Sequence, residues 1–309
     1  MVKCRKTASY EENCTCARSS CSSILWSTEK NKSDVAPVES VTAVKSAASA
    51  ETGKVAFALS LFNASLSGKS LSANVVVSPY SAGMALSMLA EGASGQTKEE
   101  LTSALNHASF AGDKLKGDKS CQLSSANSIW LRDGFSVLPA YKSLLTGSYS
   151  AEINSRNFSS PATVKEINRW CSDKTNRKIP EIVDEISPEM VMFILNALYF
   201  KAPWEYQFDK NSTIKDTFHS PSGDQEADFM RIKRQFSCAE YEGGRFVILP
   251  YKGGAWQMMI CLPDEGADIQ KLVSSVSSEM FSKAVAGAEY REVALSMPKF
   301  KIDNTLILN

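Results

Sequence analysis

The tract Phe193–Trp204 limits the fold more than any other part of the chain. Its first eight residues are apolar except for Asn196, which is typical of a strand covered on both faces. A buried amide without hydrogen-bond partners costs about 1–3 kcal/mol, so Asn196 is expected to bond to a neighbouring segment. Lys201 and Pro203 are expected to end the strand, which leaves Trp204 just past its end.

The bulk composition narrows the class of partner. The chain has 309 residues, 43% of them hydrophobic, which is enough for a substantial core. Lys plus Arg and Asp plus Glu are balanced at 34 each, so charge gives no reason to expect binding to nucleic acid or to an anionic membrane. No apolar run reaches the ~18–20 residues that a membrane-spanning helix needs.

The first fifty residues differ from the rest. Residues 28–52 are rich in Ser, Ala, Lys and Glu without a core-forming pattern. We therefore expect residues 1–50 to be a disordered extension and residues 51–309 to be the folded domain. No intact signal peptide is visible, because no apolar stretch is present near the start. The Ser-rich stretch around Cys21 faintly resembles a bacterial lipoprotein cleavage site, and a mis-assigned start of the reading frame is the alternative.

The cysteines do not predict a metal site. The spacing of Cys14 and Cys16 is wrong for a zinc knuckle, and no His lies near them. The four later cysteines stand among apolar residues and are expected to be small buried hydrophobes; they are Cys121, Cys171, Cys238 and Cys261. No metal or cofactor is therefore expected.

Periodicity predicts an α+β order of elements. Helices are expected at 51–67, at 80–91 after an N-cap at Ser78, at 139–147, from 161 onward and around 269–276, with a capping box at Thr97 and Glu100. Strands are expected at 74–77, 122–132, 151–158, 190–200 and 293–300, with a hairpin turning at Gly253 and Gly254.

The sequence argues against an enzyme. A serine hydrolase needs a nucleophile, a base and an orienting acid, but the chain has only His107 and His219, neither in a recognisable catalytic context. The segment from Gly92 to Gly95 is not a nucleophile elbow, and neither a P-loop nor a glycine-rich dinucleotide turn is present.

Four tracts resemble the serpin family, in the family's order. They are NVVVSPYS at 74–81 with the helix after it, INRW at 167–170 with TNRKI at 175–179, NALYFKAPW at 196–204, and LPDEG at 262–266 with MPKF at 297–300. The resemblance covers about 51–309 and implies an α+β serpin fold, with a large sheet A, sheets B and C and about eight to nine helices. A bacterial-type secreted serpin is one form of this reading.

The resemblance also assigns structural roles. It implies that Ser78, Pro79, Ser81 and Asn196 lie in a hydrogen-bonded cluster where the large sheet opens, and that Trp204 stands where the reactive loop first enters. As alternatives, Ser78 is an ordinary helix N-cap and Trp204 is ordinary packing. The supporting core implied by the family pattern is Leu86, Gly92, Thr97, Phe200, Phe208, Phe218, Met230, Pro298 and Phe300.

The implied activity is inhibition of a serine, or alternatively a cysteine, endopeptidase. In serpins a cleaved reactive loop inserts into the large sheet as a new strand and releases stored strain. The alternatives are a non-inhibitory serpin that acts as a binding or scaffold protein, and an inactive truncated fragment. An extracellular or cell-surface location is the family expectation.

Three departures from the family pattern qualify this reading. The family usually has Gly where Arg177 stands, and segment 103–121 is shorter than the family's helix there, so no heparin-type cofactor is expected. The chain stops at Asn309, before the reactive loop and last strands that the family places further on. We therefore expect this chain alone to be a monomer prone to aggregation, with the 190–200 strand as an apolar edge, and to inhibit no protease.

Overall fold

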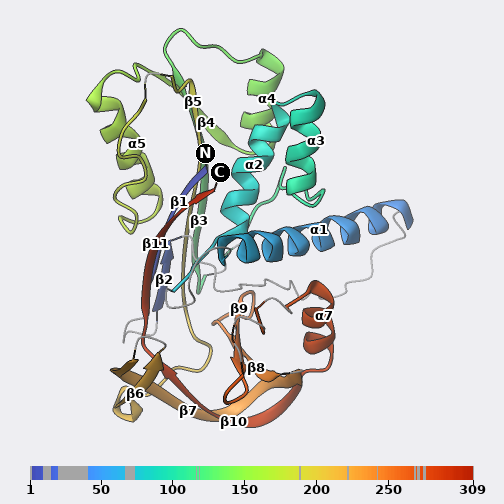
Figure 1. The fold of residues 1–309 in the computed structure, drawn as a ribbon, viewed down its shortest axis with the longest axis vertical. Helices are drawn as coiled ribbons and strands as arrows, with labels where there is room; N and C mark the ends of the chain where they lie inside the picture. Colours follow the sequence, from blue (N-terminus) through green and yellow to red (C-terminus); the bar gives the residue numbers. More distant parts are fainter. Residues whose placement is uncertain are drawn as a thin grey trace.

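The computed structural model describes the backbone of residues 2–9, 15–19, 41–66, 74–115, 117, 119–187, 189–220, 223–241, 243–267, 269, 272–273 and 276–308, and side chains within 52–302. The chain forms two sheets with helices packed around them (Figure 1). The predicted α+β class is confirmed.

The larger sheet has six strands. Their order is β11 (Lys301–Leu308), β1 (Val2–Ser9), β2 (Thr15–Ser19), β5 (Met192–Pro203), β3 (Gln122–Arg132) and β4 (Ala151–Arg156). Strands β3 and β4 pair in parallel, and the other neighbours pair antiparallel. Figure 1 shows α5 on one face of this sheet and α2, α3 and α4 on the other.

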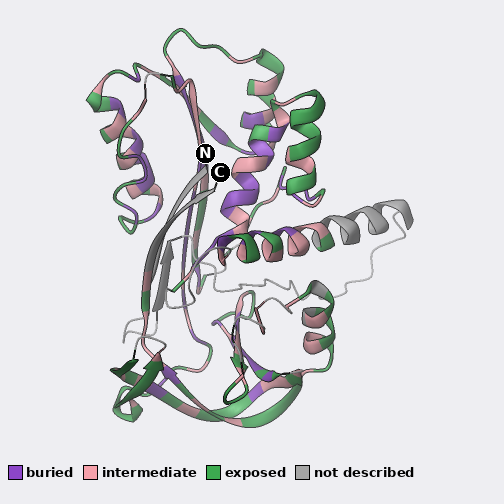
Figure 2. Ribbon diagram, in the orientation of Figure 1, coloured by how far each residue is buried: buried purple, intermediate pink, exposed green. Residues whose placement is uncertain are grey.

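The described helices match the predicted positions only in part, because the first begins at Val41, ten residues before its predicted start, and the last, at 278–286, lies beyond the helix predicted around 269–276. They are α1 (Val41–Leu66), α2 (Pro79–Glu91), α3 (Gly95–Ala104), α4 (Pro139–Ser148), α5 (Pro161–Lys174) and α7 (Ser278–Ala286), with a short 3-10 turn at Lys210–Ser212. At the start of α2 the Ser78 hydroxyl accepts from the Ser81 N–H, as predicted for an N-cap. Helix α2 is the most buried of them, whereas α3 is exposed (Figure 2).

The smaller sheet has five strands. The order is β10 (Glu289–Pro298), β7 (Gly223–Tyr241), β8 (Gly244–Pro250) and β9 (Gln257–Pro263), and β6 (Ile214–Ser220) also pairs with β7. The predicted hairpin at Gly253 and Gly254 is confirmed, and both glycines have positive φ. Because the long β7 pairs with β6 and β10 along one part and with β8 along another, the expected sheets B and C form one continuous sheet here.

The beginning of the chain differs from the expected disordered extension. Strands β1 and β2 and the first part of α1 all lie within residues 1–50. The two strands pair with each other, and they also pair with β11 and β5. Backbone groups at a sheet edge can pair with any extended segment, and a composition argument does not contain that information. The division at residue 50 stays a prediction.

Four local predictions are wrong or lie outside the described residues. Residues 74–77 pair with no strand in the described part of the chain, although Val76 and Val77 are buried. Helix α3 begins at Gly95, so Thr97 lies inside its first turn and forms no cap. Strand β5 continues through Lys201 to Pro203 because β2 and β3 pair with its end. The helix expected at 269–276 falls partly outside the described residues.

Candidate functional site

Asn196 bonds across the large sheet to β3. It lies opposite Asn127 in the β3–β5 register, and its Nδ2 donates to Asn127 Oδ1 at 2.8 Å and to Ser125 Oγ at 3.3 Å. Asn127 Nδ2 in turn donates to the Tyr149 carbonyl at 2.7 Å. The buried Oδ1 of Asn196 has no hydrogen-bond partner among the described residues. The amide is therefore half satisfied, and its acceptor is left over.

The serines at the start of α2 form a small buried cluster. Ser78 Oγ donates to Ser81 Oγ at 3.0 Å, and both residues are buried. The hydrogen bonds of the two serine hydroxyls join these residues to each other, and the side-chain hydrogen bonds of Asn196 go to β3. The expected joint cluster of Ser78, Ser81 and Asn196 stays a prediction.

Tyr80 of α2 lies near Ser125 of β3, and neither residue was predicted from the sequence. Burial raises the pKa of Tyr80 to about 12, and a hydrogen bond with the Ser125 side chain offsets part of that rise. Ser125 also accepts from Asn196. Tyr80 directly follows the predicted N-cap and Pro79, and its hydroxyl also donates to the Asp113 carbonyl at 3.5 Å. The Ser–Pro–Tyr order was the available signal.

Trp204 is fixed by aromatic stacking at the end of β5. Its ring is 2% exposed and lies parallel to the Tyr251 ring, with centroids 4.4 Å apart and planes 9° apart. Phe200 contacts both Tyr251 and Trp256 edge-on. Backbone bonds from Lys252 N–H to the Pro203 carbonyl and from Glu205 N–H to the Pro250 carbonyl join the same turn to β5. This geometry fits ordinary packing and also fits a fixed entrance beside β5.

The residues expected to form a supporting core divide into two groups. Phe200, Phe208 and Met230 are buried, while Leu86, Pro298 and Phe300 are half-buried.

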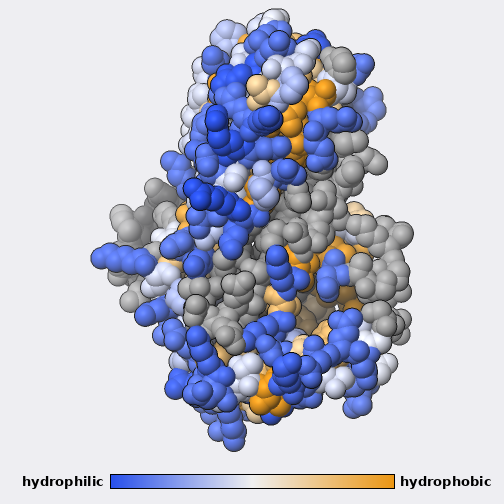
Figure 3. Space-filling view, turned by 90° about the vertical axis from the view of Figure 1, so that its left-hand side faces the viewer, coloured by the Kyte–Doolittle hydropathy of each residue, from blue (hydrophilic) through white to orange (hydrophobic). Residues whose placement is uncertain are grey.

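Gly92, Thr97 and Phe218 are exposed, so their expected place in the core is wrong. Thr97 lies on α3, which buries none of its residues. Phe218 lies on β6, which pairs only with β7 in the described chain, and hydrophobic surface is visible in this lower region in Figure 3. Gly92 caps α2, where an added Cβ would lie 3.0 Å from the Tyr141 ring.

The two edges of β5 are occupied to different extents. On one edge β5 pairs with β3 from Met192↔Leu131 to Lys201↔Gln122. On the other edge it pairs with β2 only from Tyr199↔Ser19 to Pro203↔Thr15. Within the described ranges, no strand pairs with this second edge at residues 192–198. Among the described residues, the apolar edge expected over 190–200 thus lacks a strand partner only at 192–198, and pairing with β2 contradicts it at 199–200.

Other kinds of site find no support in the described part of the chain. Among those residues, no group of three or more His, Cys, Asp or Glu side chains could hold a metal ion. No helix there has both the length and the apolar character needed to cross a membrane. The candidate site is therefore the β5 region, with its partners on β3, α2 and the β8–β9 turn.

Comparison with known proteins identifies this arrangement. The family model described as Serpin (serine protease inhibitor) matches residues 52–309. A protein named serine protease inhibitor from Cyanea capillata is 32% identical, over 74% of this chain and 66% of its own length. A thermophilic serpin, tengpin, in its latent state has a TM-score of 0.74 at 28% identity, covering 86% of this chain and 73% of that one.

A second structure gives the same fold. Reaction loop cleaved lamprey angiotensinogen has a TM-score of 0.75 at 25% identity, covering 81% of this chain and 78% of that one. The serpin fold expected from the four tracts is thereby confirmed. The chain spans 57–66% of the length of the curated relatives it matches, so the activity of the whole protein is a matter for proposal.

Proposed function

Because the chain belongs to the serpin family of serine protease inhibitors, we propose that the protein inhibits a serine or cysteine endopeptidase by taking up its own cleaved reactive loop as a strand beside β5. Loop insertion in serpins is a known case of β-strand addition. The observation that carries the proposal is the second edge of β5, where residues 192–198 have no strand partner in the described chain.

The chemistry belongs to the target protease. Its nucleophile attacks a loop carbonyl, the peptide bond breaks, the new amine leaves with a proton, and an acyl-enzyme remains. Insertion of the freed loop releases strain stored in the inhibitor and displaces the protease before water completes hydrolysis. This chain supplies the acceptor for the strand and no catalytic group of its own.

Asn196 and Trp204 are proposed to act at two points of the β5 edge that receives the inserted strand. The unpaired Oδ1 of Asn196 is an acceptor that a donor arriving with the neighbouring strand would satisfy, and satisfying it would recover part of the about 1–3 kcal/mol penalty of a buried orphan. Trp204, stacked on Tyr251, would hold the end of β5 still while its middle gains a neighbour. Ser78, Pro79 and Ser81 would position α2 behind the strand.

A non-inhibitory binding protein is the second candidate, and one observation favours it. Strand β2 already pairs with β5 at residues 199–203, next to Trp204. A sheet occupied at its entrance would not accept a loop. Competition between β2 and an added strand therefore distinguishes the two functions.

The test is uptake of a peptide. A fluorescent, Ala- and Thr-rich peptide of about the length of β5 is incubated with the chain, and binding is followed by native gel and by amide exchange. The proposal expects a complex in which the amides of residues 192–198 become protected and the melting temperature rises. Failure of the peptide to bind, with the chain folded by circular dichroism, favours the binding-protein function.

Two further proposals follow the family. The full-length protein is expected to form an SDS-resistant complex with its target protease, and trypsin, chymotrypsin and elastase are suitable first targets. It is also proposed to act outside the cell, which fractionation of a tagged full-length protein would test. Aggregation of the chain alone, expected from the open β5 edge, is measured by size-exclusion chromatography.

A further inference from the structure

Helix α5 and the segment after it cover one face of the large sheet. The helix buries Ile167, Trp170 and Cys171 in a cluster with Trp130 of β3 and with Leu195 and Ala197 of β5. The segment that returns toward β5 adds Ile179, Ile182 and Val183 to the same cluster. Because α5 and this segment pack against β5, they must shift when a strand enters beside β5.

The helix and its return segment are joined into one unit. Asn168 Oδ1 accepts from the Ile182 and Val183 N–H groups at 2.8 and 2.9 Å, and its Nδ2 donates to the Val183 carbonyl at 2.8 Å. One side chain on α5 thus satisfies three backbone groups of the return segment. We call α5 with residues 175–187 the α5 unit.

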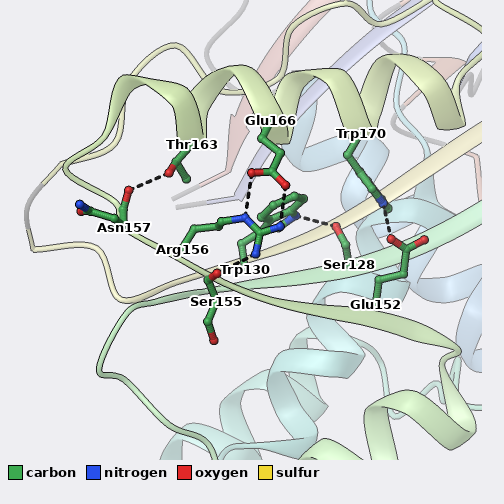
Figure 4. Close-up of polar contacts among 9 residues, drawn as sticks. All are labelled: Ser128, Trp130, Glu152, Ser155, Arg156, Asn157, Thr163, Glu166 and Trp170. Atoms are coloured by element: carbon green, nitrogen blue, oxygen red, sulfur yellow. Dashed lines mark hydrogen bonds and ion pairs between the residues drawn. The ribbon is translucent and has the colours of Figure 1, made fainter.

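Two polar anchors connect the α5 unit to β4 (Figure 4). In the first, the Arg156 guanidinium donates to both Glu166 oxygens, from Nε at 2.8 Å and from Nη2 at 2.6 Å, and lies 5.6 Å from the Trp130 ring centroid. Bidentate pairs of this kind are directional and about twice as strong as neutral hydrogen bonds. They are also the exception to the rule that surface ion pairs contribute little.

The second anchor lies at the other end of β4. Glu152 accepts from Trp170 Nε1 at 3.0 Å and forms an ion pair with Lys174 Nζ at 2.8 Å. Both anchors therefore start from β4 and reach two points of α5 that are separated by more than one helical turn. They fix the position and the direction of the helix on the β4 side.

The contacts of the α5 unit with β5 are of another kind. Those that the described residues show include the apolar cluster above and a neutral hydrogen bond from Asn176 Nδ2 to Tyr199 Oη at 3.2 Å. Apolar contacts are non-directional, and they can slide or separate without breaking a charged pair. The two sides of the α5 unit thus differ in what must be broken to move them.

We propose that Arg156 and Glu152 are positioning residues that hold the α5 unit on β4, so that the unit separates from the β5 side first and moves as one piece when a strand enters beside β5. The statement about strand entry rests on the proposed function. The separation itself is a property of the chain, and it is measured without any protease or peptide.

The first experiment is amide hydrogen exchange on the chain with E166Q, E152Q and the double variant. Ile182 and Val183 report on the α5 unit, and amides of the β3–β5 ladder report on the sheet. The proposal expects exchange in the α5 unit about two- to fivefold faster in each single variant, as fits one good surface pair, and faster again in the double variant, with the ladder unchanged. R156K keeps the charge but loses the bidentate geometry, so an intermediate effect is expected.

The matched control is E226Q. It removes an equally close ion pair between Glu226 of β7 and Lys215 of β6, away from α5. Equal acceleration of the α5 unit and the β3–β5 ladder overturns the proposal, because the layer and sheet would then open together. Acceleration no greater than in E226Q also overturns it.

The second experiment measures peptide uptake in the same variants. The proposal expects uptake to be faster in E166Q and E152Q than in E226Q. If the wild-type chain takes up no peptide, the proposed function fails while the exchange result still decides the role of the anchors. If uptake occurs at equal rates in all variants, the anchors do not govern entry and this part of the proposal fails.

Discussion

The middle and the end of β5 are held by opposite kinds of contact. At Asn196 the strand is joined to β3 by amide hydrogen bonds, and one buried acceptor has no partner in the described chain. At Trp204 it is joined to the β8–β9 turn by ring stacking and backbone bonds, and the ring is buried. The comparison shows that the middle of one strand can have room for a new strand partner while the end of the same strand is fixed by packing.

The second edge of the strand shows the same division. Pairing with β2 covers Tyr199–Pro203, beside the aromatic end, and the edge at 192–198 carries no described partner. An open backbone edge beside an unsatisfied amide is costly in isolation, so that part of the molecule has the most to gain from a new strand. The aromatic end gains nothing from one.

Removing the indole of Trp204 should reduce the stability of the chain more than any other change considered. Trp204→Ala deletes a buried indole and its stacking on Tyr251, and changes of this type reduce the free energy of unfolding by about 3–5 kcal/mol. Urea unfolding followed by far-UV circular dichroism measures it. Tyr290→Ala is the control, since Tyr290 is 72% exposed and such sites change stability by about 0.5 kcal/mol or less. If the two variants were equally stable, Trp204 would not fix this end.

Removing the amide in the middle should have a smaller effect. Asn196→Ala takes the donor from Asn127 Oδ1 but also removes the unpaired Oδ1 of Asn196, so we expect a loss near about 1 kcal/mol. The loss should grow when the peptide is bound, because the wild-type acceptor would then be satisfied. Asn154→Ala is the control, since the buried Asn154 Nδ2 has no hydrogen-bond partner among the described residues. If Asn196→Ala lowered the free energy of unfolding equally with and without peptide, Asn196 would have no role in receiving the strand.

The sequence was enough to single out Asn196 and Trp204, but it did not predict which residues they contact. The apolar run around Asn196 was enough to locate β5, since a strand covered on both faces has few other patterns. The partner of Asn196 was not predictable, because Asn127 lies in a strand with no unusual pattern and meets it only through register. Phe218 shows the opposite error, since its family position suggested a core residue although its strand lies at the outside of the sheet. Register and edge position depend on distant strands.

Acid should loosen the layer over β5 before it affects the aromatic end. The hydrogen bond from Arg156 lowers the pKa of Glu166, with a further contribution from Arg169, and that from Lys174 lowers the pKa of Glu152. A carboxyl whose folded pKa is lowered stabilises the fold above its ordinary pKa, and this contribution is lost as pH falls through the folded value. Protection of the α5-unit amides, measured as exchange relative to the intrinsic rate at each pH, should therefore decrease at pH values below the ordinary carboxyl value of 4.5.

The anchors and their surroundings define the control for this acid effect. The charged groups that face them are Arg169 near Glu166, Asp133 near Arg156 and Lys174 beside Glu152. In the E152Q/E166Q double variant the acid-dependent part of the acceleration should disappear. Glu279→Gln removes an anchor-like pair on α7 and should leave it unchanged. If the acid-dependent acceleration persisted in the double variant, other carboxyls would be its cause.

The smallest effect is expected at the turn that leads from α5 toward β5. Arg177 has φ 60° and Asn176 has φ 49°, both in the left-handed region that favours Gly, and the family resemblance led us to expect Gly at position 177. Left-handed backbone costs a residue like Arg about 1–2 kcal/mol, and Gly in turn loses about 0.5–1 kcal/mol of chain entropy on folding. Arg177→Gly should therefore stabilise the chain by at most about 1 kcal/mol in urea unfolding. Asn tolerates this backbone better, and Asn176 also bonds Tyr199 of β5, so Asn176→Gly should stabilise less or destabilise. If Asn176→Gly were the more stabilising change, the bond to Tyr199 would contribute nothing to holding the α5 unit on β5.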